Sequence, residues 1–260
     1  MKKITIFSMI LALLVSCQNN SEDNSSTVEE TMEFYNPAAD GFNIEGSDQK
    51  AISIADSVMV AMGGRKAYDE SRFFGFDFFG YRKIWWDKKA DSAIVKLNNM
   101  GLKILVDLNS KNGRVWKDGI EMENIDSIAY YSNYGYEAWV NDTYWLVMPF
   151  KLKDSGVTLN YVREDTVNSN PADVLQLTFN AVGITPENKY EVYIDQTDNL
   201  VKKWSYFKKA TDTIPSMTTP WDDYKEYNGL ALASNRGKRG LSDIIVTNKL
   251  SETPFSEYYK

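Results

Sequence analysis

From residue 72 onward the chain is a succession of short segments in which apolar and polar residues alternate, separated by tight turns. Alternation with a period of two is typical of β-strands, and Asn112-Gly113 and Asn228-Gly229 are strong hairpin signals. Short connections join antiparallel neighbours, so the sequence predicts a mainly β (α+β) fold with a large antiparallel sheet of about ten or eleven strands. Segments with strand character are residues 72–79, 82–86, 93–97, 102–108, 144–152, 158–163, 174–180, 190–195, 200–208, 223–227, 230–234 and 244–248.

Two segments carry helical periodicity instead. Ser47 is a suitable N-cap for a first helix with one apolar face, and Gly63-Gly64 would end it. Residues 123–139 also carry apolar side chains near helical spacing, but Gly135 is unfavourable inside a helix, so we expect a helical or partly helical insert. A strongly twisted antiparallel sheet of this size tends to curl. The sequence therefore predicts a curved sheet, or incomplete β-barrel, with a helical lid.

Cys17 is the only cysteine and ends the run Leu14-Val15-Ser16-Cys17, which has the composition of a bacterial lipobox. Two lysines and a short apolar stretch precede it, as in a secretory signal peptide. We expect residues 1–16 to be a lipoprotein signal peptide and Cys17 to be acylated, which would anchor the chain to a membrane. This predicts a lipid-anchored protein of the cell envelope, with the outer membrane favoured because no aspartate follows Cys17. The periplasmic and outer faces both stay open.

The segment after the cysteine is rich in Asn, Ser and acidic residues and poor in aliphatic ones. Such a composition cannot bury enough apolar surface to offset the entropy of ordering. We interpret residues 17–46 as a polar tether, whose later part could dock through Phe34, Tyr35 and Phe42, and residues 47–260 as a single domain.

Several classes of function are disfavoured by composition. The chain has no histidine, which removes histidine-based catalytic triads and histidine metal sites. The formal net charge is −7, whereas nucleic-acid binders usually present a basic face. We therefore expect a non-enzymatic, monomeric protein with no catalytic residue, no metal, no cofactor and no nucleic-acid partner.

Aromatic side chains fall on both faces of the predicted strands. Alternation places Phe74, Phe76 and Phe78 on one face, while the adjacent Trp85 and Trp86 must face opposite ways. A single-faced sheet on a solid core should have a polar outer face. Two interpretations remain open: helices cover a filled core, or the concave face of a half-barrel accepts an apolar ligand.

One block of sequence resembles a known family. Residues 141–157, which begin NDTYWLVMPFKL, are similar to a hallmark of a Bacteroidota lipoprotein family of unknown function, and Met62-Gly63-Gly64 and Pro220-Trp221-Asp222 match it in order. Members of that family resemble LolA and LolB, the periplasmic carrier and the outer-membrane receptor that handle lipoproteins. The resemblance implies an incomplete antiparallel barrel with a helical lid over a hydrophobic cavity that binds acyl chains.

The predicted ligand is therefore a lipid or acyl chain from the membrane or from a lipoprotein, held in a hydrophobic cavity. Arg82 is the candidate for a charge at the cavity mouth, where it could meet a phosphate or carboxylate. Two alternatives remain: a carbohydrate-binding surface lipoprotein that stacks sugars on Trp and Tyr, and a structural scaffold with a filled core. The candidate cavity residues are Phe74, Phe76, Phe78, Trp85, Trp86, Trp145, Leu146, Met148, Phe150 and Trp204.

Overall fold

The computed structural model describes residues 36–180 and 183–259. Cys17, Phe34, Tyr35, the predicted signal peptide and most of the predicted tether lie outside these residues. The helices are α2 (Gln49–Ala61), α3 (Arg65–Glu70) and α4 (Ile125–Val147), with 3₁₀ turns η1 (Asn98–Met100), η2 (Met148–Lys151), η3 (Leu250–Glu252) and η4 (Pro254–Glu257). The strands are β1 (Phe73–Phe78), β2 (Arg82–Asp87), β3 (Ser92–Leu97), β4 (Leu102–Asp107), β5 (Gly113–Lys117), β6 (Ile120–Glu121), β7 (Val157–Val167), β8 (Asn170–Phe179), β9 (Lys189–Asp195), β10 (Val201–Phe207), β11 (Met217–Pro220), β12 (Asp222–Tyr227), β13 (Leu230–Asn235) and β14 (Leu241–Thr247).

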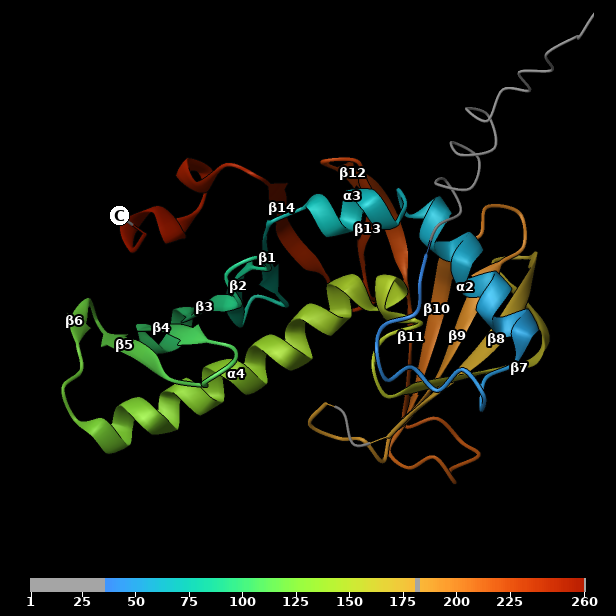
Figure 1. Ribbon diagram of the computed structural model, residues 1–260, viewed down its shortest axis with the longest axis horizontal. Coiled ribbons are helices and arrows are strands. Elements are labelled where there is room, and N and C mark those ends of the chain that lie inside the picture. Colours follow the sequence, from blue (N-terminus) through green and yellow to red (C-terminus); the bar gives the residue numbers. More distant parts are fainter. Residues whose placement is uncertain (1–35, 181–182, 260) are drawn as a thin grey trace, which may run out of the picture.

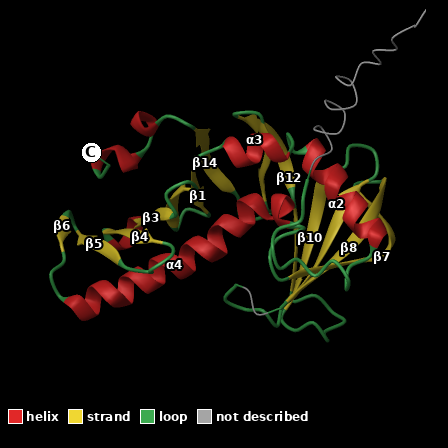
Figure 2. Ribbon diagram, viewed as in Figure 1, coloured by secondary structure: helices red, strands yellow, loops and turns green. Residues whose placement is uncertain are grey.

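These strands form antiparallel sheets that stay open, so the predicted mainly β class is confirmed (Figure 2). The larger sheet has the order β14-β1-β2-β3-β4-β5-β6, the second has the order β11-β10-β9-β8-β7, and β12 pairs with β13. The described strands are more numerous than predicted and are divided among three sheets. The larger sheet and the five-stranded sheet are separated along the chain by α4, which lies between β6 and β7, and β14 returns to the larger sheet to pair with β1.

Helix α4 is longer than expected, and the predicted strand at residues 144–152 is wrong. The helix runs on to Val147, and η2 follows it. Its buried residues Gly135, Ala138, Asp142 and Leu146 recur every three or four positions, which is the helical period. An apolar run without polar interruptions fits either period, so alternation alone could not separate the two. Figure 1 shows α4 running past the larger sheet and ending beside the five-stranded one.

Gly135 explains why a helix can lie so close to β4. A Cβ atom at this position would meet Cγ2 of Ile104 at 2.8 Å, which is shorter than real contacts allow. The glycine therefore lowers intrinsic helix propensity but permits the close approach of α4 to the sheet. Ile104 is itself fully buried, so the contact belongs to the core.

The N-terminal part of the described chain docks on β7. The N-cap of α2 is Asp48 rather than Ser47, and neither side chain caps the helix. Ser47 Oγ accepts the Leu159 N–H at 2.9 Å, and Asp48 Oδ2 accepts the Tyr161 N–H at 2.8 Å. Because β7 is an edge strand, these bonds satisfy backbone groups that would otherwise lack a partner strand. Phe42 is buried in the main core, so its predicted docking is confirmed.

None of the helices in residues 36–180 and 183–259 combines the length and apolar character needed to cross a bilayer.

Candidate functional site

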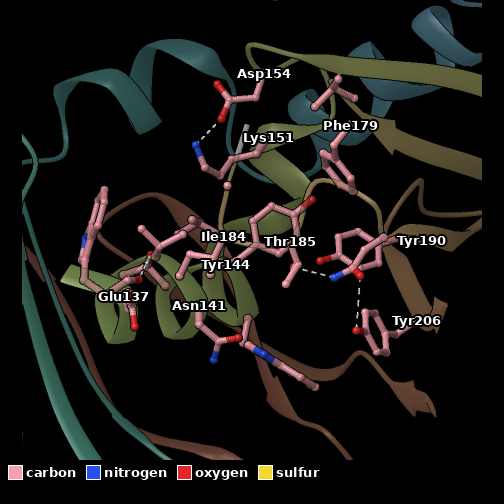
Figure 3. A pocket seen from close by; sticks show the side chains of 18 of the residues that line it. Glu137, Asn141, Tyr144, Lys151, Asp154, Phe179, Ile184, Thr185, Tyr190 and Tyr206 are labelled. Carbon is pink, nitrogen blue, oxygen red and sulfur yellow. Dashed lines mark hydrogen bonds and ion pairs between the residues drawn. The ribbon is translucent and has the colours of Figure 1, made fainter. Parts of the chain in front are cut away.

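A pocket of about 830 Å³ lies between the C-terminal half of α4 and the five-stranded sheet. One wall is α4, from Asn133 to Val147, and the opposite wall comes from the end of β8, from β9 and from β10. The turn from η2 to β7 and the loop between β8 and β9 form its edges (Figure 3). The volume falls in the range of about 300–1,000 Å³ that is typical of small-molecule sites.

Aromatic rings line the wall around Tyr190. The ring centroid of Tyr190 lies 5.7 Å from that of Tyr144, 5.0 Å from those of Phe179 and Trp204, and 5.9 Å from that of Tyr206. Most of these pairs are tilted or edge-to-face, the arrangement that the quadrupoles of the rings favour. These rings give the pocket a rigid apolar surface, which suits a hydrophobic ligand.

The interior of the pocket is electrically neutral. Burial raises the pKa of the Tyr190 hydroxyl to about 12 and that of Tyr144 well above its usual range, so both hydroxyls stay protonated at neutral pH. The charged side chains of the lining are Lys111, Glu137, Lys151 and Asp154, and all four are exposed or partly exposed, at the edge of the pocket. Lys151 pairs with Asp154, and the ammonium of Lys111 lies 4.3 Å from the ring centroid of Tyr136. A neutral aromatic interior with a charged edge is the arrangement expected for an amphiphile.

Several buried donors in this wall lack a partner among the described residues. The Tyr144 hydroxyl and the indole N–H groups of Trp86, Trp139, Trp204 and Trp221 make no hydrogen bond there, and all five residues line the pocket. An unsatisfied buried donor costs about 1–3 kcal/mol.

Among residues 36–180 and 183–259, no three His, Cys, Asp or Glu residues are grouped so that they could hold a metal ion.

Three of the candidate cavity residues line this pocket: Trp86, Trp145 and Trp204. The rings of Trp145 and Trp204 meet edge to face at 4.8 Å, which ties the end of α4 to β10. The others do not line it. Phe74, Phe76, Phe78, Leu146, Met148 and Phe150 are buried in the main core, where α2, α3 and α4 fill the space over the sheet.

Trp85 lies on the opposite face of the larger sheet. It packs with Phe73, Ile94 and Phe255 in a second cluster, which the C-terminal 3₁₀ turns cover. A Cβ at Gly75 would meet the Trp85 ring at 2.8 Å, so the glycine lets the indole lie flat on β1. The helices therefore cover the aromatic residues on one face of the larger sheet, and the C-terminal 3₁₀ turns cover those on the other face.

Arg82 does not stand at the mouth of this pocket. Its Nε and Nη2 atoms donate to the two carboxylate oxygens of Asp142 at 2.6 and 2.7 Å, and Nη1 donates to Tyr134 Oη at 3.2 Å. Asp142 is fully buried in α4. The guanidinium is thus committed to holding α4 on β2 and is not available to a ligand.

Sequence reasoning missed Tyr144, Phe179, Tyr190 and Tyr206 as pocket residues. Tyr144 falls within the predicted strand 144–152, whereas in the structure it lies on α4 and lines the pocket. Tyr190 and Tyr206 did carry a signal: they face each other across the β9–β10 pair, on the same side as Trp204. Cross-strand aromatic neighbours of a candidate residue are therefore useful additional candidates.

No family model and no curated protein matches this chain. Among solved structures, it is similar to a DUF1329 family protein from Desulfovibrio piger (12% identity, 78% of this chain and 95% of that one, TM-score 0.41). It is also similar to an outer membrane lipoprotein-sorting protein domain from Vibrio parahaemolyticus (12% identity, 80% and 97%, TM-score 0.40). A third similar structure is a LolA superfamily protein from Nitrosomonas europaea (11% identity, 76% and 96%, TM-score 0.38). These superpositions are loose, and the fold class rests on the sheets themselves.

Proposed function

We propose that this chain is a non-enzymatic protein of the cell envelope, anchored through an acylated Cys17, that binds a lipid or acyl chain in the pocket between α4 and the five-stranded sheet. The observation that carries the proposal is the pocket itself, about 830 Å³ in volume and walled by aromatic rings. In the same proposal, residues 1–16 are the signal peptide, residues 17–46 the tether, and the outer membrane is the site of anchoring.

The position of the tryptophans favours a lipid over a sugar. Sugar-binding sites use aromatic rings as flat platforms, whereas Trp204 in the pocket wall is almost fully buried. Trp145 stands edge-on to Trp204, with an angle of 75° between the two ring planes, and does not extend a platform. Walls of this kind enclose an apolar ligand from several sides. A scaffold with a filled core would leave no such space on the pocket side of α4.

Native mass spectrometry of the protein released from membranes tests the proposal, together with displacement of a fluorescent fatty acid. We expect a co-purified acyl species and competition by unlabelled fatty acid. The variant Phe179→Glu would place a charge in the aromatic wall and should abolish probe binding, because an unpaired carboxylate is costly in an apolar site.

Ile245→Glu is the matched control, since Ile245 is partly exposed on β14 and does not line the pocket. It should bind the probe as the unsubstituted chain does. If no acyl species co-purifies and the fluorescent fatty acid binds neither the unsubstituted chain nor the Ile245→Glu variant, the proposed function is wrong.

A further inference from the structure

The pocket has a second aromatic cluster, apart from the rings around Tyr190. Trp139 of α4 packs against Trp86 of β2, with 5.6 Å between the ring centroids, and against Tyr136, with 5.9 Å between them. All three residues line the pocket, and we call this part of it the Tyr136 end. Glu137, the next residue along α4, lies on the other side of the pocket from Tyr190 in Figure 3.

The Tyr136 end carries one positive and one negative side chain. Four charged residues line the whole pocket, and the two that are not at this end pair with each other. The remaining two, Lys111 and Glu137, form no ion pair with each other or with any other described residue. The Lys111 ammonium lies over the Tyr136 ring, and Oε1 of Glu137 accepts from Asn133 Nδ2 at 2.8 Å. Both charges are therefore available to a ligand.

Turn chemistry does not explain why residue 111 is a lysine. Lys111 lies in the connection between β4 and β5 and has a φ of 60°. This left-handed conformation favours glycine, asparagine and aspartate over other residues. Residues held in sparsely populated backbone conformations are concentrated at functional sites. Since the side chain of Lys111 lines the pocket, a ligand for its ammonium accounts for the lysine.

The two charges discriminate among lipid headgroups. A fatty acid or an anionic phospholipid would meet Lys111, but it would also bring its negative charge close to Glu137. A headgroup that holds a phosphate and an ammonium group meets both, because lysine is a good partner for phosphate and a carboxylate for ammonium. Aromatic ring faces beside Glu137 favour the same positive charge.

We propose that the Tyr136 end binds the zwitterionic headgroup of a phospholipid, with its phosphate on Lys111 and its ammonium on Glu137. The acyl chains then lie along the aromatic wall around Tyr190. This inference rests on the proposed function, because it names the class of lipid that the same pocket takes.

Competition between soluble short-chain lipids tests the headgroup. The full chain is loaded with a fluorescent fatty acid, which is then displaced by dihexanoyl lipids that differ only in the headgroup. Phosphatidylethanolamine and phosphatidylcholine are zwitterionic, phosphatidylglycerol is anionic, and diacylglycerol has no charged headgroup. We expect the two zwitterionic lipids to displace the fatty acid at a concentration several-fold lower than phosphatidylglycerol needs, because the ion pairs lie at the partly exposed edge of the pocket.

The variant Glu137→Gln should remove this preference, since glutamine keeps the acceptor for Asn133 but carries no charge. Glu123→Gln is the matched control: Glu123 is exposed, precedes α4 and does not line the pocket. It should keep the preference of the unsubstituted chain.

Lys111→Asn should weaken displacement by all three phospholipids several-fold and leave displacement by dihexanoylglycerol unchanged. Asparagine suits the left-handed backbone at position 111, so this variant should fold at least as stably as the unsubstituted chain.

A preference for zwitterionic lipids that Glu137→Gln removes and Glu123→Gln keeps supports the proposal. Equal displacement by zwitterionic and anionic lipids overturns it, as does a preference that survives Glu137→Gln, or a Lys111→Asn variant that binds phospholipids normally. In each of these cases binding of the fatty acid leaves the proposed function standing. If the unsubstituted chain does not bind the fluorescent fatty acid at all, the proposed function is contradicted, and this inference with it.

Discussion

Arg82 and Asp142 show how one buried ion pair fixes the wall of the pocket. Asp142 lies on α4 between the pocket residues Asn141 and Thr143, and its carboxylate is fully buried. Burial raises the pKa of this carboxyl even though Arg82 donates two hydrogen bonds to it. The pair therefore contributes little net stability in comparison with two apolar residues, but removing one partner leaves the other uncompensated. Its structural effect is to set the position of α4 against β2.

We predict that Arg82→Met lowers the free energy of unfolding by about 3–5 kcal/mol at neutral pH, because Asp142 is left as a buried, unpaired charge. Without Arg82 the pKa of Asp142 rises further above the ordinary value of 3.8. A raised pKa in the folded state means that stability falls as the pH rises through the window above 3.8. The loss should therefore be largest at neutral pH and smaller at about pH 4, as urea unfolding at several pH values can measure.

The double variant Arg82→Met with Asp142→Asn is the control. Asparagine has nearly the same shape and no charge, so the pH dependence of the loss should disappear. A loss that is equal at both pH values in the single variant would contradict the assignment to Asp142.

At the scale of elements, the sequence predicts strands better than it predicts the long helix. The hairpins at Asn112-Gly113 and Asn228-Gly229 are present as β4–β5 and β12–β13, because turn chemistry is local. The extent of α4 could not be predicted in the same way. Its C-terminal half is apolar on several sides since it faces both the core and the pocket, and that removes the polar stripe by which an amphipathic helix is recognised.

We predict that Gly135→Ala destabilises the protein, although alanine is the better helix former. The gain in propensity is about 1 kcal/mol. The new Cβ would lie 2.8 Å from Ile104 Cγ2, and overpacking of a core typically costs about 1–3 kcal/mol. The expected net loss is about 1 kcal/mol, measured by thermal or urea unfolding.

A double-mutant cycle with Ile104→Ala separates the two effects. When Ile104 is truncated, Gly135→Ala should become stabilising because only the propensity gain remains. If the effect of Gly135→Ala is the same in both backgrounds, the contact with Ile104 is not its cause.

At the scale of the molecule, the sequence could point to an aromatic cavity but not to its location. The pocket is assembled from α4, the turn before β7, the end of β8 and the β9–β10 pair, which meet only after α4 has reached the second sheet. Three of the candidate cavity residues, Trp86, Trp145 and Trp204, do line the pocket. Phe74, Phe76 and Phe78 were misplaced since the space over their strand is filled by helices, and alternation cannot reveal what covers a face.

Replacing valine by phenylalanine should affect stability differently in the filled core and in the open pocket. Val95 is fully buried in the main core, and Val95→Phe should lower the free energy of unfolding by about 1–3 kcal/mol through overpacking. Val140 lines the pocket from α4, where the larger ring has about 830 Å³ to enter. Val140→Phe should therefore leave stability unchanged or raise it slightly, because the ring buries apolar surface without displacing neighbours.

Val140→Phe should at the same time weaken binding of a fluorescent fatty acid, since the ring occupies ligand space. Stability is measured by urea unfolding and binding by titration of the same preparation. If Val140→Phe keeps or raises the free energy of unfolding while it weakens ligand binding, the pocket is an open cavity. Filling it would then stabilise the fold at the expense of binding, which is the usual trade-off between stability and function. Equal destabilisation by Val95→Phe and Val140→Phe would mean instead that side chains close the pocket in solution, and the interpretation of this space as a binding site would be wrong.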